Sequence, residues 1–166
     1  MPLTPLHALS LMFIYFKDKK RVDPLALTVS ATFIDLEPLY YLLVGEPLDH
    51  RIWHGFALAL TAYPILVTIG VYFVERLFGK KLWFAYNALR LKPKQVRYPI
   101  LIVYLCSLLG GFTHVFFDMF THKDIPYVTY PLAYGNPFYL GTASIIVEMT
   151  VIILVVYSIL EWTKAK

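Results

Sequence analysis

Histidine and aspartate recur at regular spacing near the end of an apolar stretch, in the segment GGFTHVFFDMFTHKD of residues 110–124. His114 and Asp118 are four residues apart, so a helix places both side chains on one face, one turn apart. His122 falls close to the same stripe. Two ligands at this spacing can chelate one metal ion. The pattern indicates a metal site, although a buried His–Asp hydrogen-bonded pair is the simpler alternative.

The composition of the chain places this segment in a membrane. The chain has 166 residues, of which 58% are hydrophobic and 16% are charged, and its mean hydropathy is +0.61. Soluble proteins average roughly 45–50% apolar residues, so this chain could not cover its apolar surface in water. We predict an all-α integral membrane protein in which residues 1–166 form a single helical membrane domain. It is expected to be a bundle of about four to five helices, the first of them short.

Five apolar segments are the candidate helices: residues 5–16, 25–45, 54–78, 98–121 and 140–162. The first is too short to cross a bilayer at about 1.5 Å per residue. It also lacks a basic start and a small-residue cleavage site, so a cleaved signal peptide is not expected. In the second segment, Pro38 is expected to break or kink the helix near Asp35 and Glu37. Residues 79–97 read as a basic loop.

The basic residues predict how the helices are threaded. Lys and Arg gather at residues 17–21, in the loop 79–97 and at 164–166, between or after the apolar segments. The positive-inside rule assigns these clusters to the cytoplasm. The chain would then be a multi-pass protein of the cell membrane, with its N-terminus outside and its C-terminus in the cytoplasm. All five histidines would lie on the non-cytoplasmic side. No nucleic-acid partner is expected, because no basic face of a soluble fold is evident.

Seven side chains are the candidate metal ligands: His7, Asp35, His50, His54, His114, Asp118 and His122. Ionisable residues within membrane segments are functional by default, because they are costly to bury there. Imidazole and carboxylate without thiolate suit zinc above all, with manganese or iron as alternatives. Such a site is more often catalytic than structural. One or two divalent ions would fit, the second if Asp118 bridges them.

The order of these motifs resembles prokaryotic families described as membrane-bound metal-dependent hydrolases, a set largely of unknown function. The resemblance spans most of residues 1–131 and rests on MPLTPLHALSL, Asp35-Leu36-Glu37, Asp49-His50-Arg51, His54-Gly55 and Thr113-His114-x-x-x-Asp118-x-x-Thr121-His122. Ile34 and Ile52-Trp53 depart from the family pattern, so both His50 and His54 remain candidate ligands. The resemblance implies a divalent metal ion and hydrolytic chemistry.

The ligand order is also similar to that of the zinc-dependent phospholipase C family. That similarity implies an all-helical scaffold on which Asp118 bridges two metal ions. One ion would be held by His7 and Asp118. The other would be held by Asp35, His114, Asp118 and either His54 or His50.

These observations lead to a hypothesis about function. A metal-activated water would attack an ester or phosphoester of a lipid-like substrate at the non-cytoplasmic face of the lipid bilayer. Glu37 or Asp49 could act as general base, and Arg51 could hold phosphate oxygens. The alternatives are a transport protein, a haem-binding protein, and a non-enzymatic membrane protein that uses the His/Asp cluster as a structural site.

Overall fold

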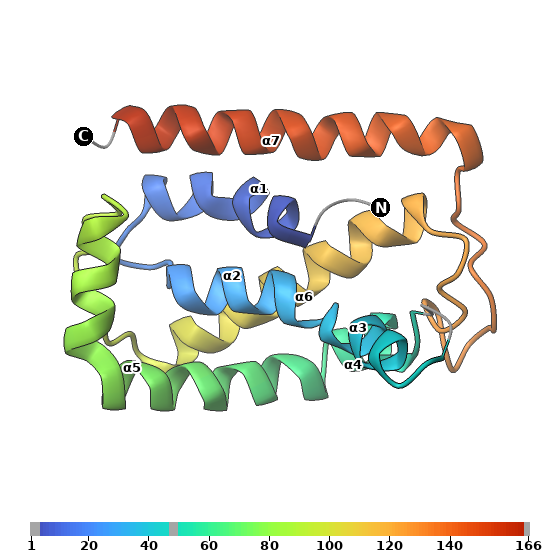
Figure 1. The fold of residues 1–166 in the computed structure, drawn as a ribbon, viewed down its shortest axis with the longest axis horizontal. Helices are drawn as coiled ribbons and strands as arrows, with labels where there is room; N and C mark the ends of the chain where they lie inside the picture. The colour runs from blue at the N-terminus through green and yellow to red at the C-terminus, as the bar shows by residue number, and fades with distance from the viewer. Residues whose placement is uncertain (1–3, 47–49, 165–166) are drawn as a thin grey trace.

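The computed structural model of the chain describes residues 4–46 and 50–164. These residues form helices and connecting loops, and no strand occurs among them (Figure 1). The order is α1 (Thr4–Lys17), α2 (Pro24–Phe33), α3 (Leu36–Leu43), the 3₁₀ turn η1 (Ile52–His54), α4 (Phe56–Ala59), α5 (Ala62–Ala88), α6 (Ile100–Thr121), the 3₁₀ turn η2 (Gly141–Ala143) and α7 (Ser144–Lys164). The predicted all-α class is confirmed.

Three stretches of helix are long and apolar enough to cross a membrane: Phe56–Ala88, Ile100–Thr121 and Gly141–Lys164. Most of their surface is not covered by the rest of the chain. Large apolar side chains such as Leu77 and Ile146 are exposed on it. An apolar surface of this extent needs lipid as its solvent rather than water. The chain is therefore an all-α membrane protein.

α1, α2, the first part of α5 and α7 run in roughly the same direction, and α6 crosses them obliquely, with α2 and α6 in the interior (Figure 1). α1 packs between α2 and α7, and α5 packs against α6. α7 forms one edge of the molecule and is the least covered of the three long stretches. The short α1 and α2 thus occupy the middle of the bundle, shielded by the longer helices.

The segment 25–45 is broken into α2 and α3, as Pro38 predicts. The break falls at Ile34 and Asp35 rather than at the proline itself. A proline ring clashes with the carbonyl four residues earlier, here that of Ile34, so the helix cannot continue through that point. Pro38 is tolerated in the first turn of α3, where its missing N–H would have no helical partner.

The basic loop 79–97 proved to be half helical. α5 continues to Ala88, through a kink at Phe78 whose backbone angles (φ −116°, ψ 17°) are not helical. Hydropathy alone placed the end of the span at residue 78, because Lys80 and Lys81 follow. The kink turns the last turns of α5 away from the rest of the helix (Figure 1). A helix can therefore continue through charged residues beyond its apolar span.

The two ends of the bundle carry different chemistry. The N-terminus of α1, the α2–α3 junction, η1, α4 and the end of α6 meet at the right of Figure 1. The left end holds the last turn of α1 with Lys17, the kinked part of α5 with Lys80, and the end of α7 with Lys164. The candidate ligands therefore lie at one end and the basic clusters at the other.

A close approach of α2 and α6 sets the depth of the candidate site. A Cβ at Gly110 would lie 2.7 Å from the Leu27 carbonyl oxygen and 2.9 Å from the Ser30 Cβ. Only glycine allows the two backbones to come so close. One turn further along α6, His114 Nδ1 reaches the Ala31 carbonyl oxygen of α2 at 2.8 Å. This close contact between α2 and α6 thus positions a candidate ligand.

Candidate metal centre

The centre is built first on α6. His114 Nε2 lies 3.0 Å from Asp118 Oδ2, as the spacing of four residues predicts, and both residues are buried (1% and 2% exposed). The hydrogen bond from His114 Nδ1 to the Ala31 carbonyl fixes the orientation of the ring on the side opposite Nε2. Because a carbonyl only accepts, Nδ1 carries the hydrogen. The opposite nitrogen of the neutral ring therefore presents a lone pair to the site.

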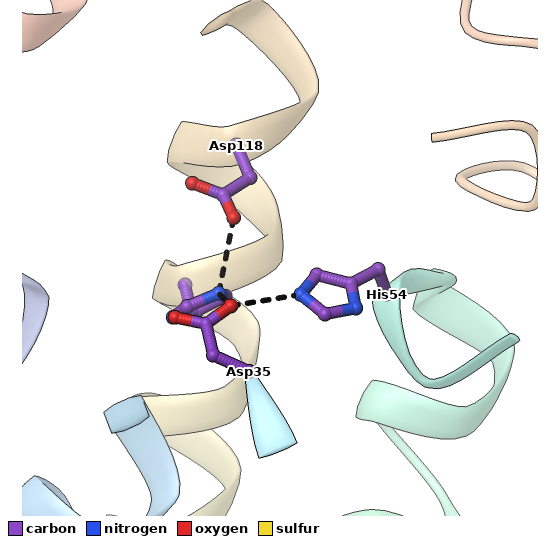
Figure 2. A group of neighbouring side chains, drawn as sticks. Asp35, His54 and Asp118 are labelled. Carbon is purple, nitrogen blue, oxygen red and sulfur yellow. Dashed lines mark hydrogen bonds and ion pairs between the residues drawn. The ribbon is translucent and has the colours of Figure 1, made fainter. Parts of the chain in front are cut away.

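Two further elements bring ligands to the same point. Asp35, at the α2–α3 break, places Oδ1 3.1 Å from His114 Nε2 and 3.1 Å from His54 Nε2. His54 ends η1 and is fully buried. Figure 2 shows Asp35, His54 and Asp118 pointing toward one another from three separate segments. Ligand atoms of Asp35, His54, His114 and Asp118 all lie within 4.8 Å of one another.

Glu37 binds the other side of the His54 ring. Its Oε2 lies 3.1 Å from His54 Nδ1, and its carboxylate also accepts the backbone N–H groups of Arg51 (3.0 Å) and Trp53 (3.2 Å). A continuous helix would separate Asp35 and Glu37 by about 200°. The break between α2 and α3 instead lets the two carboxylates face opposite edges of one imidazole. Glu37 is thus placed to orient His54, behind the convergence point, rather than where a general base would stand.

The charges in this cluster need an additional cation. A neutral imidazole has one N–H, yet His54 meets a carboxylate at each nitrogen. The His114 lone pair likewise faces two carboxylates. His114 Nε2, His7 Nε2 and Asp118 Oδ1 are buried without a hydrogen-bond partner among the described residues. Bound protons or a metal ion would remove this repulsion, so the side chains fit a divalent ion.

The pKa of His54 reflects the same charges. Burial by itself lowers the pKa of this imidazole, but hydrogen bonds to Asp35 and Glu37 outweigh burial and raise the pKa above its usual value. Without a metal ion, the same carboxylates favour a proton on His54. A metal ion and this proton would compete for the same nitrogen.

His7 reaches the site from α1. Its Nε2 lies 3.2 Å from Asp118 Oδ1, and its ring centroid lies 4.5 Å from that of His114. Asp118 therefore offers one oxygen to the His114 side and the other to His7. This use of both oxygens is what a bridging carboxylate requires.

A second group of ligand atoms adjoins the first. Atoms of His50, Asp118 and His122 lie within 4.8 Å of one another. The His50 ring centroid lies 4.5 Å from that of His54 and 4.7 Å from that of His122. The structure thus assigns His54 to the first group and His50 to the second, a choice that the sequence left open. All seven predicted ligands gather at one end of the bundle.

Asp124 is a member of the site that the sequence did not single out. Its two oxygens lie 3.0 Å from His50 Nδ1 and 3.6 Å from His122 Nδ1. The hydrogen bond to His50 lowers the pKa of Asp124 although burial opposes the shift. Its carboxylate is half-exposed, at the rim of the cluster. The available signal was the spacing His-x-Asp at residues 122–124.

Of the remaining candidate catalytic residues, the structure describes Arg51. Arg51 forms an ion pair with Glu46, and its guanidinium stacks over the Tyr41 ring at 3.6 Å. Asp49 falls outside the described residues. Glu148, within the last apolar segment, is exposed on α7. None of these side chains is among the candidate ligand groups of the described residues.

The chain belongs to a family defined as a domain of unknown function, DUF4184, whose family model matches residues 1–159. No curated protein and no solved structure matches the chain significantly. The matched region contains every candidate ligand. The predicted membership of a family of unknown function is confirmed.

Proposed function

We propose that this protein is a membrane-embedded, metal-dependent hydrolase that cleaves an ester or phosphoester of a lipid-like substrate. One observation carries the proposal. At one end of the bundle, the Nε2 atoms of His54 and His114 converge on the carboxylates of Asp35 and Asp118 at 3.0–3.1 Å. The similarity in ligand order to membrane-bound metal-dependent hydrolases and to zinc-dependent phospholipase C supports this reaction class.

Zinc fits the donor set best, with manganese or iron as alternatives. Two imidazole nitrogens and two carboxylate oxygens, without a thiolate, match catalytic rather than structural zinc sites. A bound divalent ion would polarise the ester and lower the pKa of a water ligand toward about 7. His50, His122 and the second oxygen of Asp118 could hold a second ion beside the first.

Hydrolysis joins a water oxygen to the phosphorus or acyl carbon, breaks the ester bond, and transfers a proton to the leaving alcohol oxygen. The Ala31 carbonyl and Glu37 fix the two imidazoles for this step by holding their Nδ1 hydrogens. The Asp35 side chain is 20% exposed, whereas those of His54, His114 and Asp118 are at most 3% exposed. Substrate is therefore expected to approach on the Asp35 side.

The charge distribution supports an orientation in the cell membrane. Basic residues at the far end of the bundle, such as Lys17, Lys80 and Lys164, would face the cytoplasm. The N-terminus would then lie outside and the C-terminus inside. The metal centre would open to the non-cytoplasmic face.

Metal analysis of matched variants tests the proposal. The wild-type protein, Asp118→Asn and Glu148→Gln would be purified in detergent and their bound metals measured by elemental analysis. Both changes convert an acid to its amide on a long apolar helix, but Glu148 is exposed outside the cluster. Metal should be lost from Asp118→Asn and retained in Glu148→Gln. Unchanged metal content in Asp118→Asn would refute the assignment.

Activity separates a catalytic metal from a structural one. Chelator-sensitive hydrolysis of p-nitrophenyl phosphodiesters or carboxyesters by the wild type is expected to disappear in Asp118→Asn while the variant still folds. Metal loss that unfolds the protein, with no hydrolysis by the wild type, would favour the structural alternative.

A further inference from the structure

A groove of about 760 Å³ runs beside the candidate metal centre, between α2–α3 and α5. Its walls are mostly aliphatic and aromatic, with Val29 and Phe33 on the α2 side and Val67 and Val71 on the α5 side. Glu37 is the single carboxylate of this lining. The groove is therefore apolar along its length and carries a polar group that belongs to the centre.

One end of the groove adjoins the centre. Glu37 lines the groove with one part of its side chain and accepts the hydrogen bond from His54 Nδ1 at 3.1 Å. Trp53, the residue before His54, lies in the same wall. Only the His54 imidazole separates the Glu37 carboxylate from the point where the ligand atoms converge.

The same end carries a cation. Tyr41 lines the groove, and the Arg51 guanidinium lies over its ring at 3.6 Å. A guanidinium has five N–H donors, so its ion pair with Glu46 leaves it able to bind an anion as well. An anionic head group placed here would meet Arg51, whose backbone N–H bonds to the same Glu37 carboxylate that holds His54. The opposite end, at Leu25 and Val74, offers only apolar side chains.

The length of the groove fits one hydrocarbon chain of one membrane leaflet. Along α5 its lining runs from Tyr63 to Val74, a separation of eleven positions, which is about 16 Å at about 1.5 Å per residue. Half of a bilayer core of about 30 Å is about 15 Å. A chain that lies in the groove with its head group at the centre would therefore be about as long as an ordinary lipid chain.

We infer that the groove binds the hydrocarbon chain of the substrate, and that the substrate is an anionic amphiphile, a phosphoester with a long alkyl-type chain. This inference rests on the proposed hydrolase function and specifies its substrate. The groove selects the substrate by burying its hydrocarbon chain. Arg51 and the metal centre select its head group.

Gly70 allows the groove to be filled without disturbing the backbone. Gly70 lies in the lining, and a Cβ built there meets nothing within 4 Å. Gly70→Phe would project a ring into the space for the chain. The neighbouring Ile69→Phe is a matched control, because Ile69 is 49% exposed and lies outside the groove lining. Both variants place the same side chain on the same helix.

The activity test compares chain lengths. p-Nitrophenyl phosphodiesters with alkyl groups from ethyl to hexadecyl would be hydrolysed by the three proteins in identical detergent micelles. The ratio of kcat/KM for the longest chain to that for the shortest should fall at least about tenfold in Gly70→Phe, since each methylene kept out of an apolar site weakens binding several-fold. Ile69→Phe should keep the wild-type ratio. An unchanged ratio in Gly70→Phe with full metal content would overturn the inference.

A binding test does not depend on activity. A long-chain alkyl phosphate with a diazirine at the chain end would be photo-crosslinked to the wild type and the labelled residues mapped. Labelling should concentrate at Val71 and Val74 and be competed by unlabelled alkyl phosphate. Equal labelling of the exposed Ile69 and Phe73 would overturn the inference that the hydrocarbon chain binds in the groove. Groove labelling without hydrolysis of any ester would refute the hydrolase function and leave the chain-binding site standing.

Discussion

The two ends of this protein each bury a cluster of carboxylates, but they neutralise it differently. At the metal centre, Asp35 and Asp118 face imidazole nitrogens. At the basic end, Asp23 and Glu75 are both fully buried and interact electrostatically with each other. Tyr98 N–H donates to Glu75 at 3.0 Å. Two carboxyl groups can share one proton, whereas the imidazole cluster gathers lone pairs that one proton cannot satisfy.

This difference identifies the kind of cation that each cluster requires. Asp23 also accepts the backbone N–H of Leu25 at 2.9 Å, as the cap of α2. Burial raises the pKa of Asp23 to about 6. A proton is therefore sufficient at the basic end. Imidazole nitrogen ligands and an aspartate that faces one histidine with each oxygen distinguish the end that fits a metal.

The largest expected difference between the clusters is in metal-linked stability. Thermal unfolding would be measured with and without chelator in the wild type, His114→Ala and Asp23→Asn. Metal present at about 100 times its Kd stabilises a folded protein by about 2.7 kcal/mol. The chelator effect should vanish in His114→Ala and persist in Asp23→Asn. A persistent chelator effect in His114→Ala would place the metal elsewhere.

A smaller loss is expected when the orientation of a ligand is disturbed. Glu37→Gln keeps the shape of the side chain but loses the charge that holds His54. Partners of this kind contribute about 10–100-fold to metal affinity. The dissociation constant should rise by that factor, with the helical content unchanged. Glu46→Gln is the control, because Glu46 pairs with Arg51 outside the cluster. Equal affinities in wild type and Glu37→Gln would contradict the positioning role.

Metal affinity should also depend on pH. His54 has a raised pKa in the metal-free protein, so it must release its proton before a metal binds. Affinity should increase with pH by about tenfold per pH unit for each proton displaced, up to the raised pKa. In the metal-free protein, folding stability depends on pH in the opposite direction, decreasing as pH rises. The stability contributed by protonated His54 is present below its unfolded pKa and is lost as pH rises through the folded value. Calorimetry in buffers of different ionisation enthalpy would count the released protons, and zero release would contradict this assignment.

The smallest effect is expected at the basic end. Below the raised pKa of Asp23, Asp23→Asn replaces a neutral acid by a neutral amide and should change the free energy of unfolding by only about 1 kcal/mol. Because the pKa of Asp23 is raised, wild-type stability should fall as pH rises from about 4 through about 6. The variant should lack that decline. A large loss of stability in Asp23→Asn, independent of pH, would show that the carboxylate itself is required.

The amino-acid sequence by itself determined the membrane class, the main helical segments and the His114–Asp118 half of the candidate metal centre. Long apolar runs specify helices locally, because the bilayer requires every backbone group to be bonded within its own segment. The spacing of four places His114 and Asp118 together on any helix. The break near Pro38 also follows from local sterics. The predicted end of the apolar span at residue 78 coincides with the kink at Phe78, but residues 79–88 are helical rather than a loop, because charged side chains do not prevent helix formation.

Only the tertiary structure decided which distant side chains meet. It separated His54 from His50, placed Glu37 behind His54, and brought Asp124 to the rim. It also paired Asp23 with Glu75, residues that no local pattern connects. These contacts depend on the angle at the α2–α3 break and on the close approach at Gly110, which are set by packing between helices. The helical period of 3.6 residues aligns side chains along one helix, but it does not specify which side chains of other helices they contact.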